Sequence, residues 1–179
     1  MQSIIYDVAV SVDGFIAGPG GDISGFAREG EVVEAYMARL VAYACAIMGR
    51  ATYEFGHRFD LTPGQNPYPS MRTLVFSDSL DLPPDRQVEL VRGDGRDVLA
   101  ALRQMSSGPI YLCGGGRFAG SLLARGEIDR LRLKRAPILL RGGTPLFAGA
   151  GSAPRLTCEV SRVFEGGYAY QEYAVRHPG

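Results

Sequence analysis

The sequence is poor in cysteine and histidine, and this scarcity limits the chemistry that the chain can carry. Its 179 residues include two His and three Cys, which are odd in number and lie far apart at Cys45, Cys113 and Cys158. We therefore expect no disulfide framework and no metal site. A chain of this kind fits a reducing compartment, so we expect it in the cytoplasm.

The chain also lacks a net charge and long apolar runs. Lys plus Arg and Asp plus Glu number 19 each. This balance argues against nucleic acid as the main partner, because proteins that bind nucleic acid present a basic surface to its phosphates. No segment approaches the about 18 apolar residues of a membrane helix, so we expect no membrane partner. The hydrophobic fraction of 46% and the length predict one globular domain over residues 1–179.

Apolar periodicity predicts alternating strands and helices. The expected strands are Ser3–Val12, Cys45–Met48, Thr73–Ser77, Val88–Val91, Pro109–Cys113, Ile128–Leu140, Arg155–Phe164 and Tyr168–Arg176. The expected helices are Glu31–Ala44, Thr52–Phe59, Asp97–Met105 and Arg117–Arg125, and a glycine-rich loop fills Phe15–Gly30. This order predicts an α/β fold with a mostly parallel central sheet, helices on both faces and an antiparallel C-terminal hairpin.

The strongest local motif is the run IYLCGGGRFAG, in which a strand passes through three glycines into a helix. Glycines allow close backbone approach, and a helix N-terminus offers free N–H groups, so the motif indicates an anion site. The alternative is a tight turn without a ligand. An ordinary Rossmann fold is disfavoured because its acid should follow about 20 residues later, whereas Asp129 comes too early.

Two further strand ends carry weaker signals. In IMGRATYE, Arg50 could pair with a phosphate and Thr52 could cap a helix. The alternative there is a surface arginine beside a capped helix. In VAVSVDGFIAG, a strand enters a loop long enough to cover a ligand, and Asp13 is more readily explained as the residue that holds the turn.

Taken in order, these motifs resemble the dihydrofolate reductase-like fold and, more closely, the RibD C-terminal domain family of riboflavin-biosynthesis reductases. The matching segments are SVDGFIA at Ser11–Ala17, GRATYE at Gly49–Glu54, LCGGG at Leu112–Gly116 and the ending at Ile128–Phe147. The resemblance covers nearly the whole chain. It implies a three-layer fold built on one domain, and a homodimer that forms through strands near the C-terminus.

The resemblance also implies NADPH as the cofactor, with no metal. Carried over residue by residue, it places backbone groups of Ala9 and Ile16 at the nicotinamide. The phosphates would lie against the residues Gly49, Arg50, Thr52, Ser77, Gly115, Gly116, Arg117 and Phe118. The family pattern further implies a cis peptide between Gly115 and Gly116. The expected substrate contacts are Val33, Met37, Cys113 and Lys134.

No catalytic residue follows from the motifs. In dihydrofolate reductases an acid lies sixteen positions before the glycine of the G-R motif, and that position here is Val33. Glu34 is adjacent, but neighbouring helix positions point about 100° apart. Lys134 lies in the alternating strand LRLKR, where it either extends to the sheet margin or binds an anionic or carbonyl group. Lys134, Glu34 and Asp13 therefore remain weak candidates.

These observations lead to one functional hypothesis and two alternatives. The hypothesis is an NADPH-dependent reductase that resembles 5-amino-6-(5-phosphoribosylamino)uracil reductase and transfers hydride to a small pyrimidine- or pterin-like substrate. The first alternative is an NADPH-binding module without turnover. The second is a true dihydrofolate reductase, which Val33 argues against.

Overall fold

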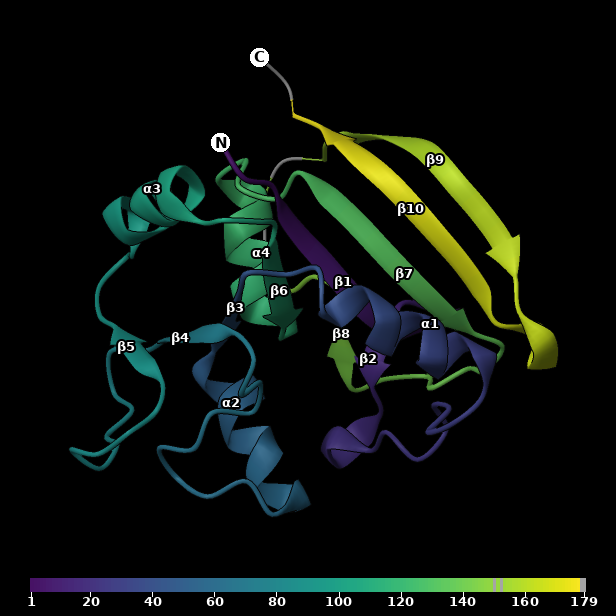
Figure 1. The fold of residues 1–179 in the computed structure, drawn as a ribbon. Helices are drawn as coiled ribbons and strands as arrows, with labels where there is room; N and C mark the ends of the chain where they lie inside the picture. The colour runs from purple at the N-terminus through teal and green to yellow at the C-terminus, as the bar shows by residue number, and fades with distance from the viewer. Residues whose placement is uncertain (150, 152, 178–179) are drawn as a thin grey trace.

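A computed structural model describes residues 1–149, 151 and 153–177 of the chain. Its main sheet has eight strands in the order β5-β4-β3-β6-β1-β7-β10-β9 (Figure 1). The strands are β1 Ile4–Ser11, β3 Cys45–Gly49, β4 Arg72–Phe76, β5 Glu89–Val91, β6 Ile110–Gly114, β7 Arg130–Ala136, β9 Arg155–Val163 and β10 Ala169–Arg176. All neighbours are parallel except for β10, which runs antiparallel to β7 and β9. The expected α/β fold and antiparallel hairpin are confirmed.

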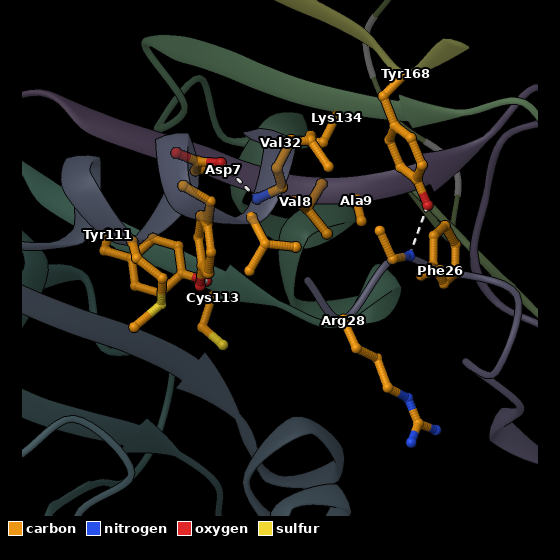
Figure 2. Close-up of a pocket in the computed structure, with 14 residues that line it drawn as sticks. Asp7, Val8, Ala9, Phe26, Arg28, Val32, Tyr111, Cys113, Lys134 and Tyr168 are labelled. Atoms are coloured by element: carbon orange, nitrogen blue, oxygen red, sulfur yellow. Dashed lines mark hydrogen bonds and ion pairs between the residues drawn. The ribbon is translucent and has the colours of Figure 1, made fainter. Parts of the chain in front are cut away.

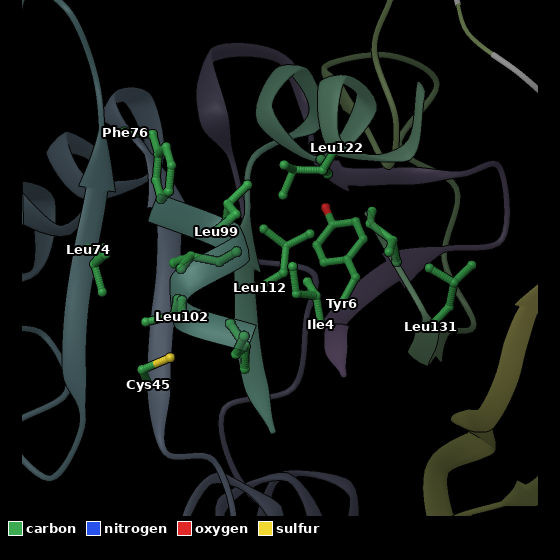
Figure 3. Packing of buried hydrophobic residues seen from close by; sticks show 14 of the residues in the cluster. Ile4, Tyr6, Cys45, Leu74, Phe76, Leu99, Leu102, Leu112, Leu122 and Leu131 are labelled. Atoms are coloured by element: carbon green, nitrogen blue, oxygen red, sulfur yellow. The ribbon is translucent and has the colours of Figure 1, made fainter. Parts of the chain in front are cut away.

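Helices cover both faces of this sheet, as predicted. They are α1 Glu31–Leu40, α2 Arg50–Phe55, α3 Arg96–Met105 and α4 Gly116–Ala124. Leu99 of α3 and Leu122 of α4 pack against Tyr6 on one face (Figure 3). On the other face, Tyr36 and Leu40 of α1 pack against a second cluster. No helix in the described part of the chain is long and apolar enough to cross a membrane.

Strand β1 shows how the sequence divides the two faces. Successive side chains of a strand point to opposite sides of the sheet. Ile4 and Tyr6 join the core under α3 and α4, whereas Ile5 joins the cluster under α1. Asp7 shares the face of Ile5, so a carboxylate is carried into the interior beneath α1, where its side chain is fully buried.

Several boundaries differ from the sequence-based expectation. The helix expected to reach Ala44 ends at Leu40, because the Ala44 N–H bonds the carbonyl of Pro109 and starts the next strand. The strand expected over Ile128–Leu140 spans only β7, and Pro137 follows its last residue without an N–H for the ladder. Helix α2 begins two residues before Thr52, so the prediction that Thr52 caps it is wrong.

Two expectations about the glycine-rich segments were wrong. The cis peptide joins Gly114 to Gly115, one bond before the predicted Gly115–Gly116 position. Gly114 has a φ of 129°, a region that favours glycine, whereas Gly115 has an ordinary φ of −67°. The segment expected as a loop after Gly14 contains the short strand β2 Phe15–Ala17, which pairs with β8 Thr144–Pro145. Short 3-10 turns occupy Pro19–Gly21, Gly56–Phe59 and Glu165–Gly167.

Candidate active site

Two cavities open where β1 and β6 end, and they adjoin each other. The larger has a volume of about 600 Å³ and the smaller about 300 Å³. Val8 of β1 and Cys113 of β6 line both of them. Ligands of parallel sheets bind at the carboxyl ends of the strands, and this position fits that rule. A molecule in one cavity can therefore touch a molecule in the other across Val8 and Cys113.

The larger cavity gathers most of the residues predicted to bind a dinucleotide. Those that line it are Ile16, Gly49, Arg50, Thr52, Gly115, Gly116, Arg117 and Phe118. They come from β2 and from the starts of α2 and α4, which lie far apart in the sequence. Two guanidinium groups and an amide-rich helix start around one cavity suit a ligand with several phosphate groups. The roles assigned to the individual residues remain predictions.

The start of α4 is built to leave its backbone amides accessible. No side chain caps this helix at Gly115. A Cβ on Gly115 would lie 2.8 Å from Thr52 Oγ1, and one on Gly116 would lie 2.3 Å from the Pro145 carbonyl oxygen. Such distances leave no room for side chains here. The two glycines therefore form a narrow cradle between α2, α4 and β8, in which the N–H groups can bind an anion.

Two of the residues expected to bind the cofactor, Ser77 and Ala9, do not line the larger cavity. The Ser77 hydroxyl accepts the N–H groups of Ser79 and Leu80 at 3.2 and 3.0 Å, so it is used within its own turn. Ser77 is not among the residues that line the larger cavity, and Ala9 lines the smaller one. Arg50 reaches toward Ser77's turn instead, donating to Ser79 Oγ at 2.7 Å.

The smaller cavity contains all four residues predicted to contact substrate. Val33, Met37, Cys113 and Lys134 line it, together with aromatic side chains from three parts of the chain, namely Phe26, Tyr36, Tyr111 and Tyr168 (Figure 2). The Tyr168 hydroxyl, at the tip of the terminal hairpin, accepts the Ala27 N–H at 2.6 Å. This bond holds the loop before α1 against the hairpin at one side of the cavity. The result is an aromatic cavity with a single deeply placed cation.

That cation belongs to a buried ionic cluster that the sequence analysis missed. Lys134 Nζ donates to Asp7 Oδ1 at 2.8 Å, and the ammonium lies 3.6 Å from the centre of the Tyr36 ring. Arg39 donates to Asp7 through Nε at 3.0 Å, and the Tyr43 hydroxyl donates at 3.1 Å. The signal in the sequence is one acid within the apolar strand IIYDVAVS, because a buried carboxylate needs a partner.

The charged groups of this cluster shift one another's pKa values. Burial alone would raise the pKa of Asp7, but Lys134 and Arg39 outweigh it and hold that pKa below its ordinary value. Burial lowers the pKa of Lys134, and Asp7 opposes part of that shift. Asp7 is therefore held in its ionised form, and Lys134 is the more readily deprotonated of its two basic partners because an arginine side chain keeps its proton.

A network of hydroxyl groups covers the floor of the cavity beside the ion cluster. The Tyr36 and Tyr111 hydroxyls lie 2.8 Å apart, and the Tyr68 hydroxyl lies 3.1 Å from Cys113 Sγ. Burial raises the pKa of all three tyrosines and of the Cys113 thiol. These groups therefore remain protonated and serve as hydrogen-bonding and stacking surfaces.

The other two catalytic candidates lie outside both cavities. Asp13 accepts the Ser11 hydroxyl at 2.6 Å and the Arg141 N–H at 2.8 Å, which ties the turn after β1 to the segment before β8. Glu34 is exposed on α1. Within residues 1–149, 151 and 153–177, no cluster of His, Cys, Asp and Glu could hold a metal ion. All three cysteines are free thiols.

The sheet order, the flanking helices and the paired cavities define an α/β protein of the dihydrofolate reductase-like class. The model of the RibD C-terminal domain matches residues 2–170, and the chain belongs to this family. Uncharacterized protein YwjB of Bacillus subtilis (strain 168) is 31% identical over 98% of both chains.

Solved structures place the chain in the same group. A Shewanella sp. PV-4 protein, provisionally described as a riboflavin biosynthesis protein, matches with a TM-score of 0.81 and 27% identity over 99% of this chain and 100% of its own. The Thermotoga maritima diaminohydroxyphosphoribosylaminopyrimidine deaminase/5-amino-6-(5-phosphoribosylamino)uracil reductase matches with a TM-score of 0.71 and 16% identity, over 97% of this chain and 56% of its own. Enterococcus faecalis dihydrofolate reductase, complexed with NADP(H) and RAB-propyl, matches with a TM-score of 0.65 and 18% identity, over 98% and 97%. The last two show the shared fold.

Proposed function

We propose that the protein is an NADPH-dependent reductase that transfers hydride to a small heterocyclic substrate. The observation that carries this proposal is the contact between the two cavities at Val8 and Cys113. A reductase must hold a cofactor and a substrate side by side, and it must do so in separate pockets of different chemistry. The RibD C-terminal family and its reductase relatives support the same activity.

The residues that line the larger cavity suit the chemistry of NADPH. Arg50, Arg117 and the open amides at the start of α4 would hold the phosphates, because they combine two guanidinium groups with a helix N-terminus. Phe76 and Phe118, whose ring centres lie 4.9 Å apart, add an aromatic wall. When bound, NADPH supplies the hydride. The residues of the chain bind it, orient it toward Cys113 and Val8, and exclude water.

The smaller cavity favours a flat, polar substrate such as an aminopyrimidine. Tyr36 and Tyr111 present aromatic rings and hydroxyls, and Lys134 presents a cation. Val33 lines the wall where a dihydrofolate reductase would use an acid to bind the pterin, so a pterin loses its main anchor here. The name of the Thermotoga maritima enzyme includes such a reaction, the reduction of 5-amino-6-(5-phosphoribosylamino)uracil. This compound is therefore the first substrate to test.

The test is a turnover assay with defined probes. The purified protein is mixed with NADPH and 5-amino-6-(5-phosphoribosylamino)uracil, with dihydrofolate in a parallel assay, and the absorbance of the reduced nicotinamide is followed. We expect oxidation that depends on the aminopyrimidine and is much slower with dihydrofolate. Tight NADPH binding without oxidation across a panel of pyrimidines and pterins would instead support a binding module. Efficient reduction of dihydrofolate would contradict the proposed substrate class.

A further inference from the structure

Lys134 is unusual in both composition and position. Lys and Arg together number 19, and Lys134 is the only lysine among them. Every surface cation of the chain is therefore an arginine, while the one lysine is 7% exposed at the bottom of the smaller cavity. Arginine cannot release its proton in a protein, whereas a lysine can when it is desolvated. Among the lysine and arginine side chains, the one that is able to release its proton thus lies in the cavity proposed for substrate, and neither His57 nor His177 lines that cavity.

The contacts of Lys134 hold its ammonium in place and leave donors available. An ammonium has three N–H donors. Among the described residues, one bond is made by Nζ, to Asp7 Oδ1 at 2.8 Å (Figure 2). The ammonium also lies 3.6 Å from the centre of the Tyr36 ring. On the sheet, Lys134 is paired with Ala9 of β1, which itself lines the cavity. The remaining donors can therefore face a substrate that lies against Ala9 and Val8.

The other titratable groups of the cavity do not meet the need for an acid. Asp7 is ionised and its oxygens accept bonds from three side chains, so it has no proton to give. The Tyr36, Tyr111 and Cys113 protons are held more firmly because burial raises the pKa of these groups. The Tyr168 hydroxyl belongs to the hairpin side of the cavity, where it bonds the Ala27 N–H of the loop before α1 rather than Asp7 or Lys134. Arg28 keeps its proton. Among the residues that line the cavity, this leaves Lys134.

We propose that Lys134 is the proton donor of the reduction, an inference that rests on the proposed function above. Hydride from the nicotinamide forms a C–H bond at the carbon of a substrate C=N or C=O group. The π electron pair moves to the nitrogen or oxygen, which takes a proton from Lys134 Nζ. The neutral amine, still beside Asp7, regains a proton from solvent. One NADPH and one proton are consumed for each substrate reduced.

Several charged groups face Lys134 and set its acidity. Asp7 of β1 favours the charged ammonium, whereas burial and Arg39 of α1 favour the neutral amine, and Cys113 of β6 has a minor influence. Tyr36 lies under the ammonium, and Tyr170 of β10 is its partner across the antiparallel ladder. Removing the charge of Asp7 should therefore make Lys134 a stronger acid.

The single lysine allows its protonation to be measured directly. Protein made with isotope-labelled lysine gives one side-chain resonance, which can be titrated by NMR with and without NADP⁺. We expect the pKa of Lys134 below the ordinary lysine value of 10.5, and lower again in Asp7→Asn. A pKa at or above the ordinary value, or one that Asp7→Asn does not change, would overturn the proposal without any activity measurement.

Kinetics with 5-amino-6-(5-phosphoribosylamino)uracil then separate proton donation from charge. Lys134→Met should lower kcat by about 100-fold to 10,000-fold, the usual contribution of a general acid. Lys134→Arg keeps the charge and the donors but not the releasable proton, so we expect an equal loss. NADPH affinity should be unchanged in both. Arg135→Met, the next residue of β7 and one that lines neither cavity, is the matched control and should retain activity.

The pH profile gives the last readout. A general acid works only while protonated, so wild-type kcat should fall as the pH rises through the pKa of Lys134 measured by NMR. Asp7→Asn should move that fall to lower pH. A Lys134→Arg variant with wild-type kcat would overturn the inference alone and would assign Lys134 to binding. A wild-type protein that binds NADPH but oxidises it with no probe would overturn the proposed function, and this inference with it.

Discussion

At the scale of single residues, the buried carboxylate of Asp7 organises the charged groups beside the smaller cavity. Its two oxygens accept bonds from Lys134, Arg39 and Tyr43, and its side chain has no exposed surface. A buried charge of this kind is stable only while its partners remain, because its desolvation is not otherwise compensated. Asp7 therefore holds the two cations at fixed positions below the cavity.

Replacing Asp7 by Asn should test this balance. The amide has nearly the same shape, but it leaves the buried Lys134 and the half-buried Arg39 without a counter-charge. We expect a loss of about 3–5 kcal/mol in the free energy of unfolding, typical of a broken buried ion pair. Urea denaturation at neutral pH measures it. Asp97→Asn, at the exposed first turn of α3, is the control and should cost no more than about 1 kcal/mol.

The same residue predicts a dependence of stability on pH. The pKa of Asp7 is lowered in the folded protein, so the unfolded chain binds this proton more readily. The stability that Asp7 contributes is complete above the ordinary value of 3.8 and is lost as the pH falls through the lower folded-state pKa. Urea midpoints of the wild type should therefore drop in that acidic range, and those of Asp7→Asn should drop less. Parallel curves for the two proteins would contradict the assignment.

Sequence alone indicated the residues that line the larger cavity, but it did not indicate the ion cluster beside the smaller one. Arg50, Thr52 and Gly115 belong to short local motifs at strand ends, which the chain sequence displays directly. The partners of Asp7 lie 32 to 127 positions away from it, and their convergence depends on β1 and β7 being neighbours. Local motifs carry no information on such pairings, so Lys134 could be assigned to a strand face but not to an ion pair.

At the scale of elements, the start of α4 depends on close approach to the segment after β8. The Ala148 N–H bonds the Gly116 carbonyl at 2.9 Å, and a Cβ on Gly120 would lie 2.0 Å from the Ala148 carbonyl oxygen. Glycine in a helix interior ordinarily costs about 0.5–1 kcal/mol relative to alanine. Its presence at position 120 is explained by this backbone contact, which holds β8 and the cradle of α4 together.

Gly120→Ala should therefore destabilise the protein even though alanine is the better helix former. The added methyl group must displace backbone at Ala148, and such overpacking costs roughly 1–3 kcal/mol. Guanidinium denaturation gives the change in the free energy of unfolding. Ser121→Ala, on the exposed side of the same helix, removes only a hydroxyl that bonds Phe118 within the helix, and it should be nearly neutral. A stabilised Gly120→Ala variant would disprove the close contact.

The types of the elements were predictable and their ends were not. Every strand of the main sheet and every helix that flanks it overlaps a segment that the sequence pattern had marked. The ends depended on hydrogen bonds between distant residues, as at Ala44 and Pro109, where a new strand begins inside the expected helix. The helical spacing of apolar residues continues past Leu40 to Ala44, so this spacing could not show where α1 ends.

At the scale of the whole molecule, the edge of the sheet suggests self-association. All nine residues of β9 are exposed, and the strand has a free edge beyond β10. Natural proteins protect such edges, and pairing of the edge with its own copy by two-fold symmetry would do so. We expect a homodimer of the 19.3 kDa chain by light scattering. Leu156→Glu with Val160→Glu should give a monomer, whereas Met105→Glu, an equally apolar exposed site on α3, should not.

Cofactor binding should stabilise the entire molecule, because the larger cavity is lined from β1, β2, α2, β4 and α4 together. A ligand that binds only the folded state at 100 times its Kd adds about 2.7 kcal/mol. For a chain of this size each kcal/mol raises Tm by about 2–4 °C, so NADPH should raise it by roughly 5–10 °C. Thermal denaturation with increasing NADPH measures this shift, and an unchanged Tm at saturating concentrations would contradict the assignment of the cavity.

The position of the phosphates within that cavity can be tested by comparing two arginines in similar settings. Arg50 and Arg96 are each the first residue of a helix, each is exposed, and each pairs with a nearby carboxylate, Glu54 and Asp94 respectively. Arg50 lines the larger cavity and Arg96 does not. Arg50→Ala should remove charge-assisted bonds of about 1.5–3 kcal/mol and weaken NADPH binding about tenfold or more. Arg96→Ala should leave the affinity unchanged. Equal affinities in the two variants, measured by titration calorimetry, would show that the phosphates lie elsewhere.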